Sequence, residues 1–375
     1  MLRSLFALLL SGYFTLAAAS MPQSPAVVGN AWLVGDMSSG QILGSEKADK
    51  RFEPASLTKL MTAYLVFTAL HEKKLSLQQQ VPVSEHAWKT PGSRMFIEPG
   101  KPVTVEQLIE GMEVQSGNDA CIALAEAVAG SQDIFVQMMN REAQRLGMTN
   151  THFVNPTGLP DPQHYSTAHD IYLLGSALIS DFPVEYAKYY SQKEFTYNNI
   201  TQRNRNRLLW LDPSVDGMKT GHTEEAGYCM VASAKHGPRR LISVLLGSTS
   251  EQMRAQESLK LLNWGFQFFD SVKLYDKDQA VKSLEVWKGA VGKVKAGFNR
   301  AIMISVPKGD ADKLKAELQS QQPLVAPVAQ GQRVGMLRLT LYGKPVAEYP
   351  LLALEPVGVA GIFGRAWDTL RLWLK

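Results

Sequence analysis

The sequence is poor in cysteine and carries little excess charge of either sign. Only two of its 375 residues are cysteines, Cys121 and Cys229, so disulfides cannot be the main source of stability. A single disulfide between them is an alternative, but the sequence favours two buried free thiols. Basic residues exceed acidic ones by only four, which does not predict binding to nucleic acid.

Several catalytic signatures are also missing. The chain has no Gly-x-Ser-x-Gly elbow and no His-Glu-x-x-His pair, and its seven histidines show no ligand spacing. We therefore expect neither a metal ion nor a cofactor. His164 and His169 lie in a loop-rich segment, where surface or capping roles are favoured over chemistry. No internal repeat at solenoid periods and no low-complexity tract are present.

The apolar run near the N-terminus is too short to span a membrane. It follows a basic start, Met-Leu-Arg, and ends in the small residues Ala-Ala-Ala-Ser. This order is typical of a secretory signal peptide. We therefore expect residues 1–19 to be removed and the mature chain to begin at Ser20. The alternative, an uncleaved membrane anchor, is disfavoured by the length of the run.

The C-terminal segment, residues 357–375, predicts an amphipathic helix with an apolar stripe and flanking cations. Three charges that fall between the ends of its apolar stripe, Arg365, Asp368 and Arg371, argue against a membrane span. Tryptophans beside cations are typical of helices that lie in a membrane interface, and we expect this role. Packing of the same stripe on the protein's own core is the alternative. The stripe contains Ile362, Phe363, Ala366, Trp367, Leu370, Trp373 and Leu374.

Between the two ends the pattern predicts helices and strands in a mixed order. Two apolar runs around Ser-Ser-Gly predict a hairpin over 31–44, and a second hairpin covers 228–248. Residues 84–100 lack periodicity and read as a loop. Helices are predicted from Ser56 onward and over 104–114, 119–130, 131–147 and 251–269.

The pattern changes after residue 272. From there to residue 356 the chain consists of short β-like runs separated by Gly and Pro, which predicts a separate all-β domain. The domain organisation we expect is a signal peptide (1–19), a catalytic domain (20–272), an all-β domain (273–356) and an amphipathic membrane-anchoring helix (357–375).

The stretch "FEPASLTKLMTAYL" places Ser56 and Lys59 three residues apart in otherwise apolar surroundings. On a helix the two side chains share one face. A desolvated amine has a lowered pKa and can take the proton of a nearby hydroxyl. The same spacing recurs at Ser305 and Lys308, but Pro307 blocks a helix there. The first pair is therefore the candidate nucleophile and base.

Two further motifs follow in order. "QSGNDA" contains Ser116 and Asn118, the only Ser-x-Asn, and "GMKTGHT" contains the only Lys-Thr-Gly, which begins at Lys219. Each triplet alone could be a turn or a strand end. Together with Ser-x-x-Lys they form the set found in penicillin-binding proteins and class A β-lactamases.

The whole chain resembles the low-molecular-mass D-alanyl-D-alanine carboxypeptidases of the penicillin-binding protein 5 and 6 group. The resemblance includes "SLTKLMTAYL", "SGNDACIALAEAVAGS", "NRNRLLW", "DGMKTGHT" and "LLNWGFQFF", together with the β-domain and the tail. It implies an α+β catalytic domain, with an antiparallel sheet flanked by helices and the Lys-Thr-Gly segment on an edge strand. It also implies a place at the periplasmic face of the bacterial inner membrane.

The same resemblance implies the catalytic roles. Ser56 would attack the bond between the last two D-alanines of a peptidoglycan stem peptide, and Lys59 would accept its proton. Ser116 would relay a proton to the leaving amine. Asn118 would hold the substrate amide and Lys59, and Lys219 would add positive charge beside Ser116.

Substrate binding is implied for four further positions. Thr220 would bind the terminal carboxylate, and Arg205 would supply a cation for it, although Arg207 offers the same chemistry. Gly221 would let the substrate backbone approach the strand. The backbone N–H groups of His222 and Ser56 would form the oxyanion hole.

Three alternatives were weighed. A dedicated β-lactamase is disfavoured because no Glu-x-x-Leu-Asn pentad lies between Asn118 and Lys219, although weak β-lactam turnover stays open. A transpeptidase or endopeptidase would share the acylation step with β-lactam-sensitive carboxypeptidases. An inactive wall-binding homologue is disfavoured because all three motifs are intact.

Overall fold

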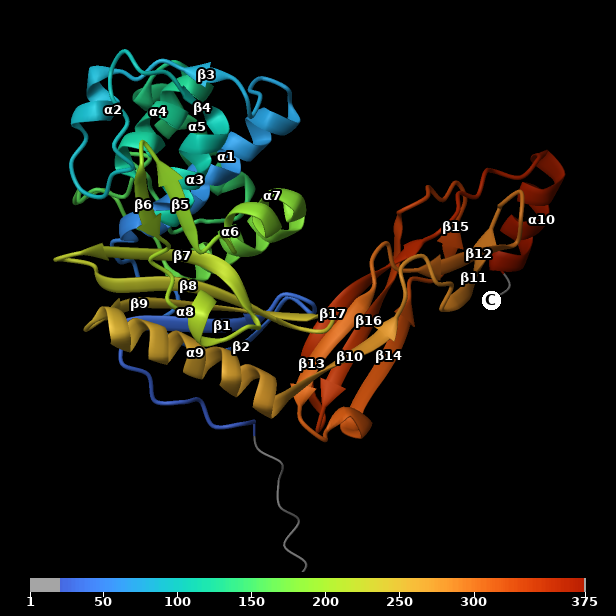
Figure 1. Cartoon of the computed structure of the whole chain (residues 1–375). Helices are drawn as coiled ribbons and strands as arrows, with labels where there is room; N and C mark the ends of the chain where they lie inside the picture. The colour runs from blue at the N-terminus through green and yellow to red at the C-terminus, as the bar shows by residue number, and fades with distance from the viewer. Residues whose placement is uncertain (1–20, 374–375) are drawn as a thin grey trace, which may run out of the picture.

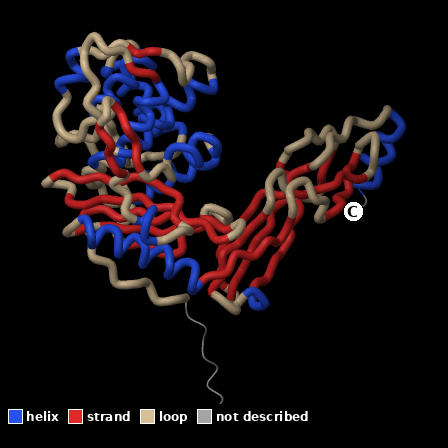
Figure 2. The backbone as a smooth tube through the Cα atoms, in the orientation of Figure 1, coloured by secondary structure: helices blue, strands red, loops and turns tan. Residues whose placement is uncertain are grey.

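The computed structural model describes residues 21–373, so the predicted signal peptide lies outside the described residues. The chain forms a body of helices and sheet followed by an elongated β lobe set at an angle to it (Figure 1). The second lobe is built almost entirely from strands and loops until its last helix (Figure 2). The predicted fold class, α+β with a following all-β unit, is confirmed.

The main sheet has five antiparallel strands in the order β2-β1-β9-β8-β7. Both predicted hairpins are present, β1 with β2 and β8 with β9. Strand β7, which carries the Lys-Thr-Gly motif, is an edge strand as expected. The strands are β1 Ala31–Asp36, β2 Gln41–Glu46, β7 Val215–Thr223, β8 Gly227–His236 and β9 Arg239–Ser248.

Helices cover both faces of this sheet. Helix α9 (Glu251–Phe268) lies along one face, and the layer that includes α1 and α6 lies on the other (Figure 1). The central strands are therefore buried on both sides, which explains why every residue from Leu241 to Leu246 in β9 is buried and all but Ser243 are apolar. The apolar layer between helices and sheet holds the catalytic motifs in fixed positions.

The helical layer agrees with most predicted helices. Thr104 caps α3 in a capping box with Gln107, and Gly130 ends α4 in the left-handed conformation. Its helices are α1 Lys59–His71, α2 Glu85–Lys89, α3 Val105–Val114, α4 Asn118–Ala129, α5 Gln132–Arg145, α6 Ala168–Asp181, α7 Pro183–Tyr189 and α8 Leu208–Leu211. Its short strands are β3 Gln80–Val81, β4 Val103–Thr104, β5 Glu194–Tyr197 and β6 Ile200–Arg203.

Three local predictions were wrong. The helix predicted from Ser56 begins at Lys59, after a 3₁₀ turn over Ala55–Thr58. The predicted loop over 84–100 contains α2, whose first turn is capped by the Ser84 side chain. The third concerns the helix predicted over 131–147: its apolar residue Ile134, which the helical pattern groups with the core residue Phe135, is 50% exposed because α5 begins at the surface.

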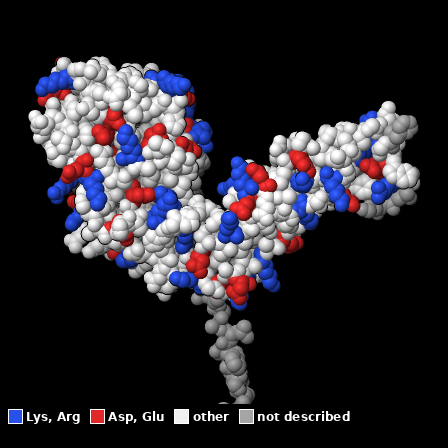
Figure 3. All heavy atoms as spheres, turned by 45° about the vertical axis from the view of Figure 1, so that its right-hand side comes forward, with Lys and Arg blue, Asp and Glu red and all other residues white. Residues whose placement is uncertain are grey.

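The two cysteines are free and buried, which confirms the favoured prediction. The structure thus relies on apolar packing, with one core cluster above the sheet, a second beneath it and a third in the β lobe. On the face drawn in Figure 3, basic and acidic side chains are interspersed, in agreement with the small net charge.

The β lobe contains a six-stranded sheet, β14-β16-β17-β12-β11-β15, and the pair β10-β13. Its strands are β10 Phe269–Tyr275, β11 Lys282–Trp287, β12 Lys293–Gly297, β13 Ile302–Pro307, β14 Leu314–Ser320, β15 Leu324–Val325, β16 Arg333–Leu341 and β17 Lys344–Ala353. A short 3₁₀ turn, η2, spans Ala311–Lys313. Strand β10 follows α9 directly, so no linker separates the two lobes.

A buried aspartate joins the lobes. Asp36, at the end of β1, accepts hydrogen bonds from Arg239 Nε at 2.7 Å and from Ser305 Oγ at 2.9 Å. Ser305 belongs to the second Ser-x-x-Lys, and it lies in strand β13 rather than in a helix. The sequence expectation that this copy does not lie on a helix is therefore confirmed.

The chain ends in helix α10 (Ile362–Trp373), at the tip of the β lobe far from the main sheet (Figure 1). Its polar side contacts the lobe: Asp368 Oδ2 accepts from the Lys288 N–H at 2.6 Å, and the Arg371 guanidinium lies over the Trp287 ring. On the apolar side, Trp367 is 63% exposed. The side chains of Phe363 and Leu370, and all of Leu374, lie outside the described residues.

Among the described residues, no helix combines the length and apolar character needed to cross a bilayer.

Candidate active site

A cavity of about 270 Å³ opens where four segments meet: the 3₁₀ turn before α1, the loop between α3 and α4, strand β7 and the start of α9. It is lined by Ser56, Ser93, Ser116, Arg205, Thr220, Gly221, His222, Tyr228, Glu251 and Arg254. Six of the nine predicted site residues are in this set. The other three, Lys59, Asn118 and Lys219, are buried, and they are described in turn below.

Lys59 begins α1 with its side chain fully buried. Its amine lies 3.1 Å from Ser56 Oγ, 2.6 Å from Asn118 Oδ1 and 2.7 Å from the Thr157 carbonyl oxygen. The Asn118 amide is oriented by its own N–H, which donates to the Pro91 carbonyl at 2.7 Å. Asn118 Oδ1 and the Thr157 carbonyl oxygen can therefore only accept hydrogen bonds from the Lys59 amine.

This arrangement suits a neutral amine. A neutral amine has two N–H donors and one lone pair. The donors are used by Asn118 and Thr157, which leaves the lone pair for the hydroxyl of Ser56. Desolvation lowers the pKa of Lys59 to about 8, which brings the neutral form much closer to neutral pH than in a free lysine. The pair thus has the geometry of a nucleophile and its general base.

The Ser-Gly-Asn motif forms the tight connection between α3 and α4. Ser116 has a φ of 65°, an uncommon value for a residue with a side chain, and its hydroxyl is buried without a hydrogen bond among the described residues. Gly117 is required because a Cβ there would lie 2.9 Å from Asp119 Oδ1. Asp119 in turn accepts from the N–H groups of Met95 and Phe96 and so fixes the loop opposite.

Strand β7 forms the other wall. A Cβ at Gly221 would lie 3.1 Å from the backbone nitrogen of Ser56, so glycine allows the strand to approach the nucleophile. The Gly221 carbonyl accepts a hydrogen bond from Arg254 Nη1 at 3.1 Å. Thr220 and Lys219 are buried, while the His222 side chain is exposed.

The buried amine of Lys219 is close enough to Lys59 to interact with it electrostatically. Desolvation is the largest cause that lowers the pKa of Lys219, and the neighbouring charge of Lys59 lowers it further. The two amines therefore oppose each other's protonation.

A buried histidine supports the turn that carries Ser56. His164 Nδ1 accepts from the Val154 N–H at 3.3 Å, so Nε2 carries the proton and donates to Thr58 Oγ1 at 2.8 Å. Thr58 then donates to the Ala55 carbonyl at 2.8 Å. Burial lowers the pKa of His164 to about 4, which keeps the ring neutral. Of the two roles favoured from the sequence, surface or capping, the surface role is wrong, because His164 is buried and supports a turn through its hydrogen bonds.

Sequence reasoning overlooked Arg254, Tyr228 and Glu251 in the cavity wall. A signal existed for Arg254: it lies on the same helical stripe as Ser258 and Leu261, which face the core. A cation on that stripe predicts a buried charged partner. Of the two candidate arginines, Arg205 lines the cavity and donates to the Gln115 carbonyl, whereas Arg207 is absent from the cavity wall.

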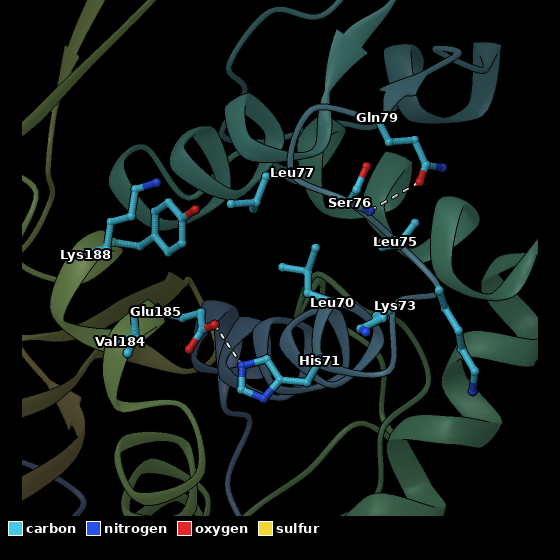
Figure 4. A pocket seen from close by; sticks show the side chains of 12 residues that line it. Leu70, His71, Lys73, Leu75, Ser76, Leu77, Gln79, Val184, Glu185 and Lys188 are labelled. Carbon is cyan, nitrogen blue, oxygen red and sulfur yellow. Dashed lines mark hydrogen bonds and ion pairs between the residues drawn. The ribbon is translucent and has the colours of Figure 1, made fainter.

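A larger cavity, of about 640 Å³, lies at the opposite end of α1 beside α7 (Figure 4). Its apolar wall includes Leu70 and Leu77, and His71 Nε2 lies 2.8 Å from Glu185 Oε1 across it. No hydrogen bond between a lysine amine and a serine hydroxyl is found there in the described chain. Size alone therefore does not identify the reactive site.

Comparison with known proteins agrees with this geometry. The family model for D-alanyl-D-alanine carboxypeptidase matches residues 18–250, and that for the penicillin-binding protein 5 C-terminal domain matches residues 269–358. The D-alanyl-D-alanine carboxypeptidase DacC of Escherichia coli is 46% identical over 360 residues, which cover 94% of this chain and 90% of the relative.

Solved structures give the same result. Penicillin-binding protein 5 of Haemophilus influenzae is 41% identical, with a TM-score of 0.86 over 90% of this chain and 99% of that chain. Penicillin-binding protein D2 of Listeria monocytogenes, in its ampicillin-bound form, is 32% identical with a TM-score of 0.60, and covers 65% of this chain and 99% of its own.

Proposed function

Since the chain belongs to the D-alanyl-D-alanine carboxypeptidase family, we propose that it removes the terminal D-alanine from peptidoglycan stem peptides through an acyl-enzyme on Ser56. The observation that carries this proposal is the contact of 3.1 Å between Lys59 Nζ and Ser56 Oγ. The other two hydrogen bonds of the amine go to Asn118 Oδ1 and to the Thr157 carbonyl oxygen. A positioned base beside a hydroxyl is the requirement for serine acylation.

In the first step, Ser56 Oγ attacks the carbonyl carbon of the penultimate D-alanine while Lys59 takes the hydroxyl proton. The oxyanion is held by the backbone N–H groups of Ser56 and His222. Collapse of the tetrahedral intermediate breaks the peptide bond. The leaving amine of D-alanine receives a proton through Ser116, whose hydroxyl has no competing partner among the described residues. The products are an ester on Ser56 and free D-alanine.

In the second step, water adds to the ester and releases the shortened peptide. Lys59 is again the base, because no carboxylate lines the nucleophile side of the cavity wall and Glu251 lies at the start of α9. The released Ser56 alkoxide recovers the proton from Lys59. β-Lactams would acylate Ser56 by the same attack, and slow hydrolysis of that ester would give weak β-lactamase activity.

The terminal carboxylate is proposed to bind Thr220 and two arginines. Arg205 lines the cavity from the surface, and Arg254 approaches it from beneath β7. Arginine suits this role because its planar donors match a carboxylate. Asn118 holds the substrate amide beside Lys59.

Replacing Arg205 by alanine is expected to raise KM for a peptide with a free C-terminal carboxylate by about 10-fold to 100-fold, the usual value of a hydrogen bond to a charged group. Steady-state D-alanine release measures this. Arg207→Ala is the matched control and should leave KM unchanged, because Arg207 does not line the cavity. Equal effects of the two substitutions would contradict the assignment.

We further propose that α10 holds the enzyme on the periplasmic face of the bacterial inner membrane. The contacts of Asp368 and Arg371 with the β lobe turn the polar side of the helix inward. Ile362, Trp367 and Trp373 are 75%, 63% and 84% exposed. Tryptophan-rich apolar faces insert into the headgroup region. The β lobe would then keep the site away from the lipid surface and close to the cell wall.

Deletion of residues 357–375 is expected to abolish co-sedimentation with vesicles of phosphatidylethanolamine and phosphatidylglycerol. The rate on a soluble peptide should stay the same, because α10 lies at the far end of the β lobe from β7 and α9 (Figure 1), whose residues line the cavity. Trp367→Ser tests the same idea with one exposed side chain and should weaken binding. Loss of peptidase activity on soluble substrate after the deletion would refute the separation of roles.

A further inference from the structure

The peptide bond that enters Ser56 is held at its carbonyl end by buried groups. Its carbonyl belongs to Ala55 and its N–H to Ser56, and in a planar trans bond these two groups point in opposite directions. Ala55 is buried and has a φ of 46°, an uncommon value for a residue with a side chain. Such a conformation persists only where surrounding contacts maintain it, so the contacts of this carbonyl matter for the nucleophile.

A chain of three hydrogen bonds reaches this carbonyl from the segment 153–164. The Val154 N–H donates to His164 Nδ1 at 3.3 Å, and His164 Nε2 donates to Thr58 Oγ1 at 2.8 Å. The Thr58 hydroxyl then donates to the Ala55 carbonyl oxygen at 2.8 Å. Each donor has one acceptor, so the direction of the whole chain is fixed. Both side chains are buried, so bulk water does not compete for these bonds.

The same segment also closes on the carbonyl by direct contact. A Cβ at Gly158 would overlap the Ala55 oxygen and would lie 2.8 Å from Thr58 Oγ1. Thr157, the preceding residue, accepts from the Lys59 amine at 2.7 Å through its carbonyl oxygen. One buried segment therefore determines both the orientation of the peptide after Ala55 and the position of the candidate base.

The other end of this peptide lies at the cavity. Ser56 is in the first turn of a 3₁₀ helix, where backbone N–H groups have no acceptor within the helix. It lines the cavity opposite strand β7, and a Cβ at Gly221 would lie only 3.1 Å from its nitrogen. This N–H is one of the two assigned above to the oxyanion hole. The orientation of the carbonyl therefore decides where an oxyanion donor points.

We propose that His164 is a positioning residue for the oxyanion hole. Through the Thr58 hydroxyl it fixes the Ala55 carbonyl, and the carbonyl fixes the direction of the N–H at the other end of the same peptide. This inference rests on the proposed function of the Ser56 site. A hydrogen bond to the carbonyl also polarises the peptide and strengthens its N–H as a donor. His164 is not part of the cavity wall, so it acts only through the turn.

His164→Leu removes the first side-chain donor of this chain. We expect it to slow acylation of Ser56 by a fluorescent penicillin by about 10-fold, the upper value for one hydrogen bond, with unchanged noncovalent affinity. A misdirected oxyanion donor raises the energy of the tetrahedral intermediate but not that of the bound ligand, so kcat for D-alanine release falls and KM does not. His164→Gln supplies an N–H near the position of Nε2 and should keep the rate within about twofold of the wild type.

A second step separates the oxyanion donor from the nucleophile. Hydrolysis of the penicilloyl ester passes through another tetrahedral intermediate, in which water and not the Ser56 hydroxyl is the nucleophile. A misdirected oxyanion donor slows both steps to a similar extent, whereas a misplaced hydroxyl slows acylation alone. The experiment measures acylation and release of the fluorescent label for the full enzyme, wild type and variants, with thermal unfolding as a check of folding.

Thr58→Val breaks the chain at its second side chain and gives an independent test if His164→Leu does not fold. It should show the same loss in both steps. The double variant should be no slower than Thr58→Val alone, because both substitutions interrupt one chain. His152→Gln is the matched control, since that ring lies just before the same segment but donates to the Gln163 carbonyl at 2.8 Å. Both rates should stay unchanged in this control.

Wild-type rates of both steps in a folded His164→Leu enzyme would overturn the proposal. A loss confined to acylation or to noncovalent affinity, or a loss of equal size in His164→Gln, would overturn it as well. If the wild type released no D-alanine from a peptide, the carboxypeptidase proposal would fail. The penicillin acylation and release rates would still decide the role of His164, because they require no peptide substrate.

Discussion

Ser56→Ala and Lys59→Met should each reduce D-alanine release from a peptide ending in D-Ala-D-Ala by at least about 1000-fold. Ser56→Ala removes the nucleophile. Lys59→Met keeps the length of the buried side chain but removes the base, so Ser56 Oγ retains its proton. The measurement is the initial rate of D-alanine release by purified enzyme. Fluorescent penicillin should fail to label Ser56→Ala and should label Lys59→Met very slowly.

The chain offers a matched control in its second Ser-x-x-Lys. Lys308 is exposed and follows strand β13, so Lys308→Ala should leave the rate unchanged. A Lys59→Met enzyme with more than a tenth of the wild-type rate would show that another group is the base. No release by the wild type, with penicillin still bound to Ser56, would instead indicate a transpeptidase or an endopeptidase.

Gly158→Ala should destabilise the protein by about 3 kcal/mol or more and should also lower the catalytic rate. Gly158 has a φ of 81°, and a Cβ there would overlap the Ala55 carbonyl oxygen. Ala55 itself has a φ of 46° in the turn that carries Ser56. A clash between two backbone segments cannot be relieved by a rotamer change, so the turn must move. Urea-induced unfolding and D-alanine release measure the two effects.

Gly147→Ala separates the steric clash from the backbone penalty. Gly147 has nearly the same φ, 80°, but no atom lies within 4 Å of the Cβ position. Its substitution should cost only about 1 kcal/mol and should leave the catalytic rate unchanged. If Gly158→Ala were no more harmful than Gly147→Ala, close approach would not be the reason for glycine at position 158.

Much of the fold could be predicted because the signals are local. The capping box at Thr104 and the glycine end of α4 involve residues within one turn of each other. The alternation and turn residues of the hairpins also lie close together in the chain. The start of α1 was misplaced by three residues because Ala55–Thr58 forms a 3₁₀ turn. Contacts with His164 and Gly158, about 100 residues away, support that turn.

The motif residues were predicted in the same way, from residue type and order. Residue type and order do not reveal which side chains from other segments surround each motif residue. Arg254 supports β7 from a helix 33 residues further on, although it belongs to no motif. The choice between Arg205 and Arg207 also depended on which side chain lines the cavity.

The sequence by itself determined the family, the order of the three motifs and the identity of the nucleophile–lysine pair, since each is written in a short segment. Only the tertiary structure decided how the pKa of Lys59 is lowered and how its amine is placed beside Ser56. Its second and third partners, Asn118 and Thr157, lie 59 and 98 residues away. Burial and charge balance arise only when such distant segments pack together, because desolvation depends on everything that surrounds a group.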